Sequence, residues 1–187
     1  MHTIEDFDVL TLPGWQGSGP DHWQTHWEAA FPSLRRVRQD DWEFPVYDKW
    51  ATRLGETVAA CRKPVILVPH SLSNALIARW SQDANTQKIA GAFMVATSDI
   101  ERFVGTPLST AKGFDPMVLK PLPFPALVVC SSNDERVTLD RSQFFASAWR
   151  ADFVNVGALG HIGSAAKLGV WPQGLVLFGQ FLASLRA

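Results

Sequence analysis

The sequence has little cysteine and no long hydrophobic run. Cys61 and Cys130 are the only cysteines among 187 residues, and both stand among apolar neighbours far apart in the chain. The first residues lack the basic stretch and apolar core of a signal peptide, so we expect buried free thiols in a cytoplasmic protein rather than a disulfide. No apolar run approaches the roughly 20 residues that cross a bilayer, which predicts no contact with a membrane.

An excess of charge of one sign is also missing. The chain has 17 Lys and Arg against 18 Asp and Glu, spread along its length. Without a basic stripe or an acidic tail, we expect no nucleic-acid partner. A hydrophobic fraction of 47% suits a soluble globular chain, and the length suits a single domain. A protein partner is compatible with this composition, but no segment indicates one.

Short apolar runs alternate with longer segments of helical periodicity, which predicts a parallel sheet wrapped by helices in a three-layer α/β sandwich. The expected strands are residues 8–12, 34–39, 64–68, 89–96, 126–130 and 152–156. The expected helices are residues 21–31, 47–61, 71–82, 139–150 and 175–185. Right-handed crossovers then favour the strand order 2-1-3-4-5-6.

The connection between the fourth and fifth strands, residues 97–125, is long and contains five prolines. A connection of this length inside a compact domain is typical of a functional loop, so we expect it to form part of a pocket. It is too short for a large cap domain.

Three reactive side chains follow the ends of separate predicted strands. Ser71 follows the third strand, Asp134 the fifth and His161 the sixth. The carboxyl ends of parallel strands meet at one edge of the sheet, and Ser-Asp-His is the chain order of the α/β-hydrolases. We therefore predict Ser71 as nucleophile, His161 as base and Asp134 as the acid that orients the imidazole.

Each of these residues has an ordinary alternative role. Taken alone, Ser71 also suits a helix N-cap, Asp134 a turn and His161 a structural position. Asp99, just past the fourth strand, is a rival for the acid.

A metal site is a weaker hypothesis. His22 and His26 have the spacing of two ligands on one helix face, but no third ligand is evident. We therefore predict neither a metal nor a cofactor.

Backbone N–H groups beside the serine are expected to stabilise an oxyanion. Leu72, directly after the serine, is one predicted donor, and Trp15 or Gln16, in the glycine-rich segment after the first strand, is the other. The predicted pocket walls are Trp15, His70, Phe103, Phe114 and Trp171.

Four segments carry a family resemblance: "LPGWQGSGPDHWQTHW", "VPHSLSN", "KPLPFPALVVCSSNDERV" and "GALGHIGSAAKLGVWPQG". Over nearly its whole length the chain resembles the small α/β serine hydrolases typified by retinoblastoma-binding protein 9 and its bacterial relatives, which lack the large cap of typical lipases. The resemblance implies the same triad and hydrolase activity on small esters or amides. The sequence departs from the family at Pro69, Ser73 and Gly163, where members usually have glycine, a small residue that is commonly glycine, and asparagine.

The leading hypothesis is a serine hydrolase that cleaves small acyl esters, or thioesters or amides, through an acyl-serine intermediate. The alternative is a protein-interaction module on a hydrolase scaffold, with weak or no catalysis.

Overall fold

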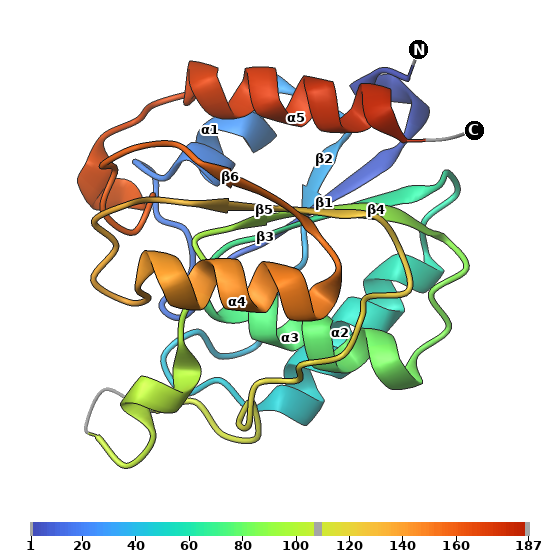
Figure 1. Ribbon diagram of the computed structural model, residues 1–187. Helices are drawn as coiled ribbons and strands as arrows, with labels where there is room; N and C mark the ends of the chain where they lie inside the picture. The colour runs from blue at the N-terminus through green and yellow to red at the C-terminus, as the bar shows by residue number, and fades with distance from the viewer. Residues whose placement is uncertain (1, 107–109, 186–187) are drawn as a thin grey trace.

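The computed structural model describes residues 2–106 and 110–185 (Figure 1). Six parallel strands form one sheet in the order β2-β1-β3-β4-β5-β6, as predicted. The strands are β1(Asp8–Leu12), β2(Leu34–Arg36), β3(Val65–Pro69), β4(Ile89–Val95), β5(Ala126–Cys130) and β6(Asp152–Asn155). The α-helices are α1(Trp23–Ala30), α2(Tyr47–Ala59), α3(Leu72–Asp83), α4(Leu139–Trp149) and α5(Pro172–Ser184).

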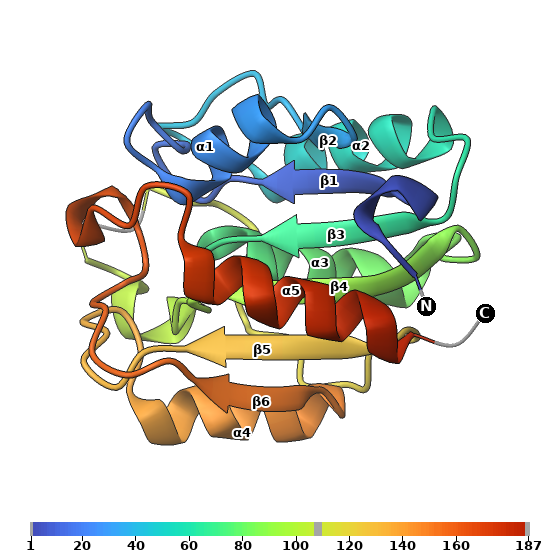
Figure 2. The same cartoon turned by 90° about the horizontal axis from the view of Figure 1, so that it is seen from above.

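The sheet is covered on both faces, which makes a three-layer α/β-hydrolase fold. Helices α1 and α5 lie on one face, and α2, α3 and α4 lie on the other (Figures 1 and 2). Successive residues of a strand point to opposite faces, so β3 supplies both cores. Val65 and Leu67 pack with α2, α3 and α4, whereas Ile66 and Val68 pack with α1 and α5. This double burial explains the continuously apolar sequence of β3.

The largest departures from the predicted bounds, three residues each, are at the end of β2 and at the start of α5. Strand β2 ends at Arg36 rather than at residue 39, because only three of its residues pair with β1. Helix α5 begins at Pro172 rather than at residue 175, with the proline in the first turn, where its missing N–H costs no helical bond.

The connection between β4 and β5 contributes to the hydrophobic core as well as to the site. It contains a short 3-10 helix, η2(Ile100–Phe103). Beyond η2, its side chains Phe114, Met117, Leu122 and Phe124 are buried with α2, α3 and α4. Residues 107–109 of the predicted pocket-forming loop lie outside the described residues.

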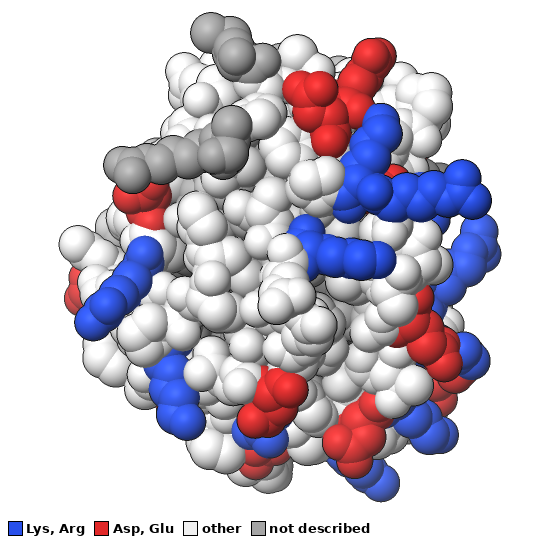
Figure 3. Space-filling view, turned by 90° about the vertical axis from the view of Figure 1, so that its right-hand side faces the viewer, with Lys and Arg blue, Asp and Glu red and all other residues white. Residues whose placement is uncertain are grey.

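Charged side chains of both signs are interspersed over the face at the amino ends of the strands (Figure 3). Cys61 and Cys130 are free and buried, as predicted. Within residues 2–106 and 110–185, no helix is both long and apolar enough to cross a membrane.

Candidate active site

Ser71 lies in a sharp turn between β3 and α3. Its backbone angles, φ 57° and ψ −122°, fall in a region that residues with a side chain rarely adopt. Two neighbouring strands hold the turn: the His70 N–H donates to Leu12 O at 3.0 Å, and the Ser71 N–H donates to Val95 O at 3.1 Å. This is the strand-turn-helix geometry of a nucleophile elbow, which exposes the serine hydroxyl above the sheet.

Two of the three residues at which the sequence departs from the family, Pro69 and Ser73, lie at this turn and fit it. Pro69 is the last residue of β3, paired with Leu12 of β1. The hydroxyl of Ser73 is buried and donates to Pro13 O at 2.6 Å. Ser73 therefore ties the first turn of α3 to the segment that follows β1.

Gly14 brings that segment directly against the turn. A Cβ at Gly14 would lie 2.7 Å from Ser71 Cβ, 3.0 Å from His70 O and 3.2 Å from Leu72 N. No side chain fits in this space, so the glycine permits the close approach of two backbone segments.

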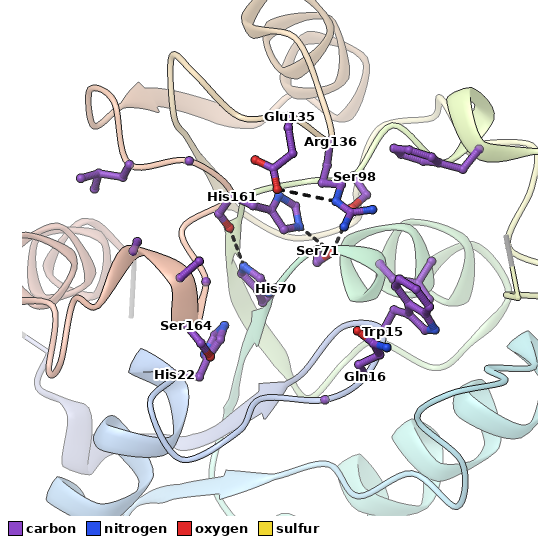
Figure 4. Close-up of a pocket in the computed structure, with 18 of the residues that line it drawn as sticks. Trp15, Gln16, His22, His70, Ser71, Ser98, Glu135, Arg136, His161 and Ser164 are labelled. Atoms are coloured by element: carbon purple, nitrogen blue, oxygen red, sulfur yellow. Dashed lines mark hydrogen bonds and ion pairs between the residues drawn. The ribbon is translucent and has the colours of Figure 1, made fainter. Parts of the chain in front are cut away.

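Ser71, His161 and Asp134 form a continuous hydrogen-bonded chain. Ser71 Oγ lies 2.8 Å from His161 Nε2 (Figure 4). On the other side of the ring, His161 Nδ1 lies 2.8 Å from Asp134 Oδ2 and 2.9 Å from Oδ1. The Asp134 side chain is fully buried and also accepts the Arg136 N–H at 2.8 Å. Because the carboxylate accepts Nδ1–H, the lone pair of Nε2 is the part of the ring that faces Ser71 Oγ.

The segment that carries His161 is fixed by side chains from three other elements. Asn133, after β5, accepts the Gly160 N–H at 2.7 Å. The indole of Trp23, at the start of α1, donates to Ile162 O at 2.8 Å. His70 Nε2, after β3, lies 2.9 Å from His161 O. These contacts limit the positions that the imidazole can take.

The Asp99 carboxylate binds a different partner from the Asp134 carboxylate. Its buried carboxylate accepts two hydrogen bonds from Arg141 of α4, at 2.8 and 3.1 Å. It therefore holds α4 against the end of β4 rather than bonding to His161.

The predicted oxyanion donors differ in whether their N–H group already has an acceptor. The Gln16 N–H donates to Trp42 O at 2.9 Å, so it is already occupied. Within the described residues, the N–H groups of Trp15 and Leu72 have no acceptor. Leu72 begins α3, where an N–H group has no partner inside the helix.

A cavity of roughly 620 Å³ opens above Ser71. Three of the predicted wall residues, Trp15, His70 and Phe103, line it. The segment 97–125 contributes Ser98, Ile100, Phe103 and Ala111 to the lining.

The prediction that Phe114 and Trp171 line this cavity is wrong. Phe114 is 3% exposed and packs edge-on against Trp50 in the core, with ring centroids 5.7 Å apart. Trp171 is 2% exposed and packs against Trp23, with ring centroids 5.2 Å apart. Both side chains turn from their loops into the hydrophobic cores.

Sequence reasoning missed Ser98, whose Oγ lies 2.9 Å from Ser71 Oγ. A signal was present, since Ser98 closely follows the end of β4 at the same edge of the sheet as the three residues of the hydrogen-bonded chain. It also missed Glu135 and Arg136 at the cavity wall, where the Arg136 guanidinium lies over the Phe103 ring.

Two further histidines of the cavity lining are held neutral by burial. Burial lowers the pKa of His22 to about 3 and holds the pKa of His70 well below its usual value. Their rings meet edge to face, with centroids 4.7 Å apart. Among the described residues, no group of three His, Cys, Asp or Glu side chains is placed to hold a metal ion.

Comparison with known proteins identifies the family. The family model described as serine hydrolase matches residues 9–180. The chain belongs to the serine hydrolase family. This confirms the resemblance to small serine hydrolases and makes the protein a hydrolase.

Solved structures agree with this assignment. A YdeN-like hydrolase from Pectobacterium atrosepticum is 32% identical, with a TM-score of 0.85 over 96% of this serine hydrolase and 92% of the relative. The ydeN gene product of Bacillus subtilis is 15% identical, with a TM-score of 0.74 over 95% of this chain and all (100%) of that chain, a likeness of fold alone. The sequence search against curated proteins gave no match.

Proposed function

We propose that this hydrolase cleaves small acyl esters through an acyl-serine intermediate, with Ser71 as nucleophile, His161 as general base and acid, and Asp134 as the acid that orients His161. The observation that carries the proposal is the continuous hydrogen-bonded chain from Ser71 Oγ through His161 to the buried Asp134 carboxylate. Ser71, at one end of this chain, faces a cavity of a size that accepts a small organic molecule.

In the first half of the reaction, Ser71 Oγ attacks the ester carbonyl carbon while His161 Nε2 takes the hydroxyl proton. The carbonyl oxygen becomes negatively charged and accepts hydrogen bonds from the Leu72 and Trp15 N–H groups. One such donor contributes about 10²–10³ in rate. His161 then gives its proton to the departing alkoxide, which leaves as an alcohol.

In the second half, a water molecule takes the place of the alcohol. His161 removes its proton as the water oxygen attacks the acyl carbon, and the same two N–H groups hold the second oxyanion. Collapse of this intermediate returns the proton to Ser71 Oγ and releases the carboxylic acid. Asp134 stabilises the imidazolium form of His161 in both halves.

A fluorophosphonate probe tests the nucleophile, because it reacts with an activated serine hydroxyl. We expect covalent labelling of Ser71, located by peptide mapping, and loss of labelling in Ser71→Ala. The matched control is Ser132→Ala, at an exposed serine past the end of β5, which should label like the wild type. Labelling at Ser73 or Ser131 would overturn the assignment.

Complete absence of labelling in the folded protein would favour the interaction-module alternative.

The two free, buried thiols agree with the cytoplasm as the proposed compartment.

A further inference from the structure

Ser98 brings a second hydroxyl group against the nucleophile. It lies in the segment between β4 and η2, and its Oγ lies 2.9 Å from Ser71 Oγ. Ser71 Oγ is therefore in contact with both Ser98 and His161 (Figure 4). Within the described residues, the Ser98 hydroxyl makes no other hydrogen bond. It caps no helix and ties down no loop, so its one contact is with the reacting oxygen.

The backbone on both sides of Ser98 is held in place. The Ala96 N–H donates to Val129 O of the neighbouring strand at 2.9 Å. The Asp99 N–H donates to Arg136 O at 3.2 Å. Ala96 has a φ of 48°, in the left-handed region, where the chain turns directly after the end of β4. The Ser98 hydroxyl is thus preorganised, because its backbone is fixed before a substrate binds.

The protons of the hydrogen-bonded chain determine the direction of this contact. Asp134 accepts the Nδ1–H of neutral His161, so Nε2 has only a lone pair to offer. Ser71 donates its single hydroxyl proton to this Nε2, at 2.8 Å. Towards Ser98, Ser71 Oγ then acts only as an acceptor. The Ser98 O–H is therefore the donor.

A donor to Ser71 Oγ accelerates only a step in which its hydrogen bond becomes stronger. In the free enzyme the bond already exists, so the attack by Ser71 on the substrate gains nothing from it. In the acyl-enzyme Oγ is an ester oxygen, bonded to two carbon atoms, and is a weaker acceptor than a hydroxyl oxygen. When the second tetrahedral intermediate collapses, the C–Oγ bond breaks and its electron pair returns to Oγ. A hydrogen bond to this developing negative charge is stronger than one to a neutral oxygen.

We propose that the Ser98 hydroxyl donates a hydrogen bond to Ser71 Oγ as this oxygen leaves the acyl carbon, and thereby accelerates deacylation but not acylation. The inference rests on the proposed acyl-serine mechanism. In this step His161 Nε2 transfers its proton to Oγ, while the proton of Ser98 stays on Ser98. The carboxylic acid, which has taken its second oxygen from water, departs. Ser71 regains its hydroxyl group and its contact with Ser98.

The test separates the two steps with p-nitrophenyl butyrate at a saturating concentration. Two quantities are measured: kcat, and the fraction of the enzyme that carries a butyryl group at steady state. Acid quenching followed by intact mass spectrometry gives this fraction. The rate constant of deacylation is kcat divided by the acylated fraction, and that of acylation is kcat divided by the remaining fraction.

Ser98→Ala removes the donor. We expect the rate constant of deacylation to fall about tenfold, the effect of one hydrogen bond, while that of acylation changes little, so the acylated fraction rises. Ser98→Thr keeps a hydroxyl group and should deacylate like the wild type. The matched control is Ser132→Ala, the same change at an exposed serine past the end of β5, which should keep both rate constants.

Three outcomes would overturn the inference. An equal fall of both rate constants in Ser98→Ala would show that Ser98 only supports the packing around Ser71. An unchanged rate constant of deacylation would show that the hydrogen bond is not used. Deacylation as slow in Ser98→Thr as in Ser98→Ala would show that the hydroxyl is not the active group. Absence of both turnover and a butyryl adduct in the wild type would instead overturn the proposed function, and this inference with it.

Discussion

Asp134 and Asp99 follow the carboxyl ends of neighbouring strands, yet only Asp134 contacts His161. Asn in place of Asp134 presents an amide that no longer favours the Nδ1–H tautomer of the histidine. We therefore expect Asp134→Asn to lower kcat by about 10⁴ while the chain stays folded. The measurement is steady-state hydrolysis of p-nitrophenyl acetate.

Asp99→Asn is the paired comparison. It weakens the bonds to Arg141, so its expected effect is a lower melting temperature, with kcat reduced far less than by Asp134→Asn. A large loss of kcat from Asp99→Asn, beside a nearly silent Asp134→Asn, would reverse the assignment of the acid.

The depressed pKa of His22 links the stability of the protein to pH. The pKa is about 3 in the folded chain and about 6.5 in an unfolded one. Below about pH 6.5 the unfolded chain therefore binds a proton that the folded chain does not, and the free energy of unfolding falls as the pH falls toward 3. The slope from this one group is at most about 1.4 kcal/mol per pH unit.

His22→Asn removes that titration, so the free energy of unfolding of the variant should depend less steeply on pH than that of the wild type. Urea unfolding of both proteins at about pH 7 and about pH 5 gives their free energies of unfolding. The other titrating groups are the same in both proteins, so the difference in pH dependence is due to His22. Parallel pH dependences would contradict the prediction.

The positions of Ser71, Asp134 and His161 could be predicted because each lies just past a strand whose end the apolar pattern marks. The pocket walls could not be predicted as well. Phe114 and Trp171 lie in loops, where spacing does not determine the direction of a side chain. Their large apolar surfaces are buried in the cores instead.

At the scale of elements, the contact between the β1 loop and the start of α3 depends on Gly14. A Cβ there would lie 2.7 Å from Ser71 Cβ, so Gly14→Ala must push the loop away from the turn. The Trp15 and Leu72 N–H groups would then separate. We expect kcat to fall by about 10²–10³, as for the loss of one oxyanion donor, with a smaller change in KM.

Gly19→Ala is the matched control, because a Cβ at Gly19 meets nothing within 4 Å. It should hydrolyse p-nitrophenyl acetate like the wild type. Wild-type kcat in Gly14→Ala would show that the loop approach is not needed for catalysis.

The central elements were predictable because their periodicity follows from burial. Strands β1 and β5 have the bounds that the sequence predicts, since all their buried residues except Thr11 are apolar. The start of α5 could have been found from Pro172, a typical first-turn residue. The end of β2 could not, because it depends on where the pairing with β1 stops.

For the whole molecule, the lining of the cavity predicts the acyl length that the enzyme prefers. Each buried methylene contributes about 0.8 kcal/mol, but only while apolar walls surround it. The larger apolar side chains of the lining include Trp15, Ile100, Phe103 and Leu159, and the described residues contain no inserted helical cap that would build a long tunnel. We expect kcat/KM for p-nitrophenyl esters to rise from acetyl to butyryl and to rise no further by octanoyl. A steady rise through octanoyl would contradict this.

The indoles of α1 face the segment that carries His161. Trp23 donates to Ile162 O and Trp27 donates to Val170 O, both at 2.8 Å, and Trp171 packs against Trp23. Indole emission depends on the local hydrogen bonding and polarity, so we expect the fluorescence of these three tryptophans to change when the backbone around His161 moves. We therefore expect the proposed acylation of Ser71 to change the intrinsic fluorescence, which would follow the reaction in real time with no dye attached and no chromogenic leaving group.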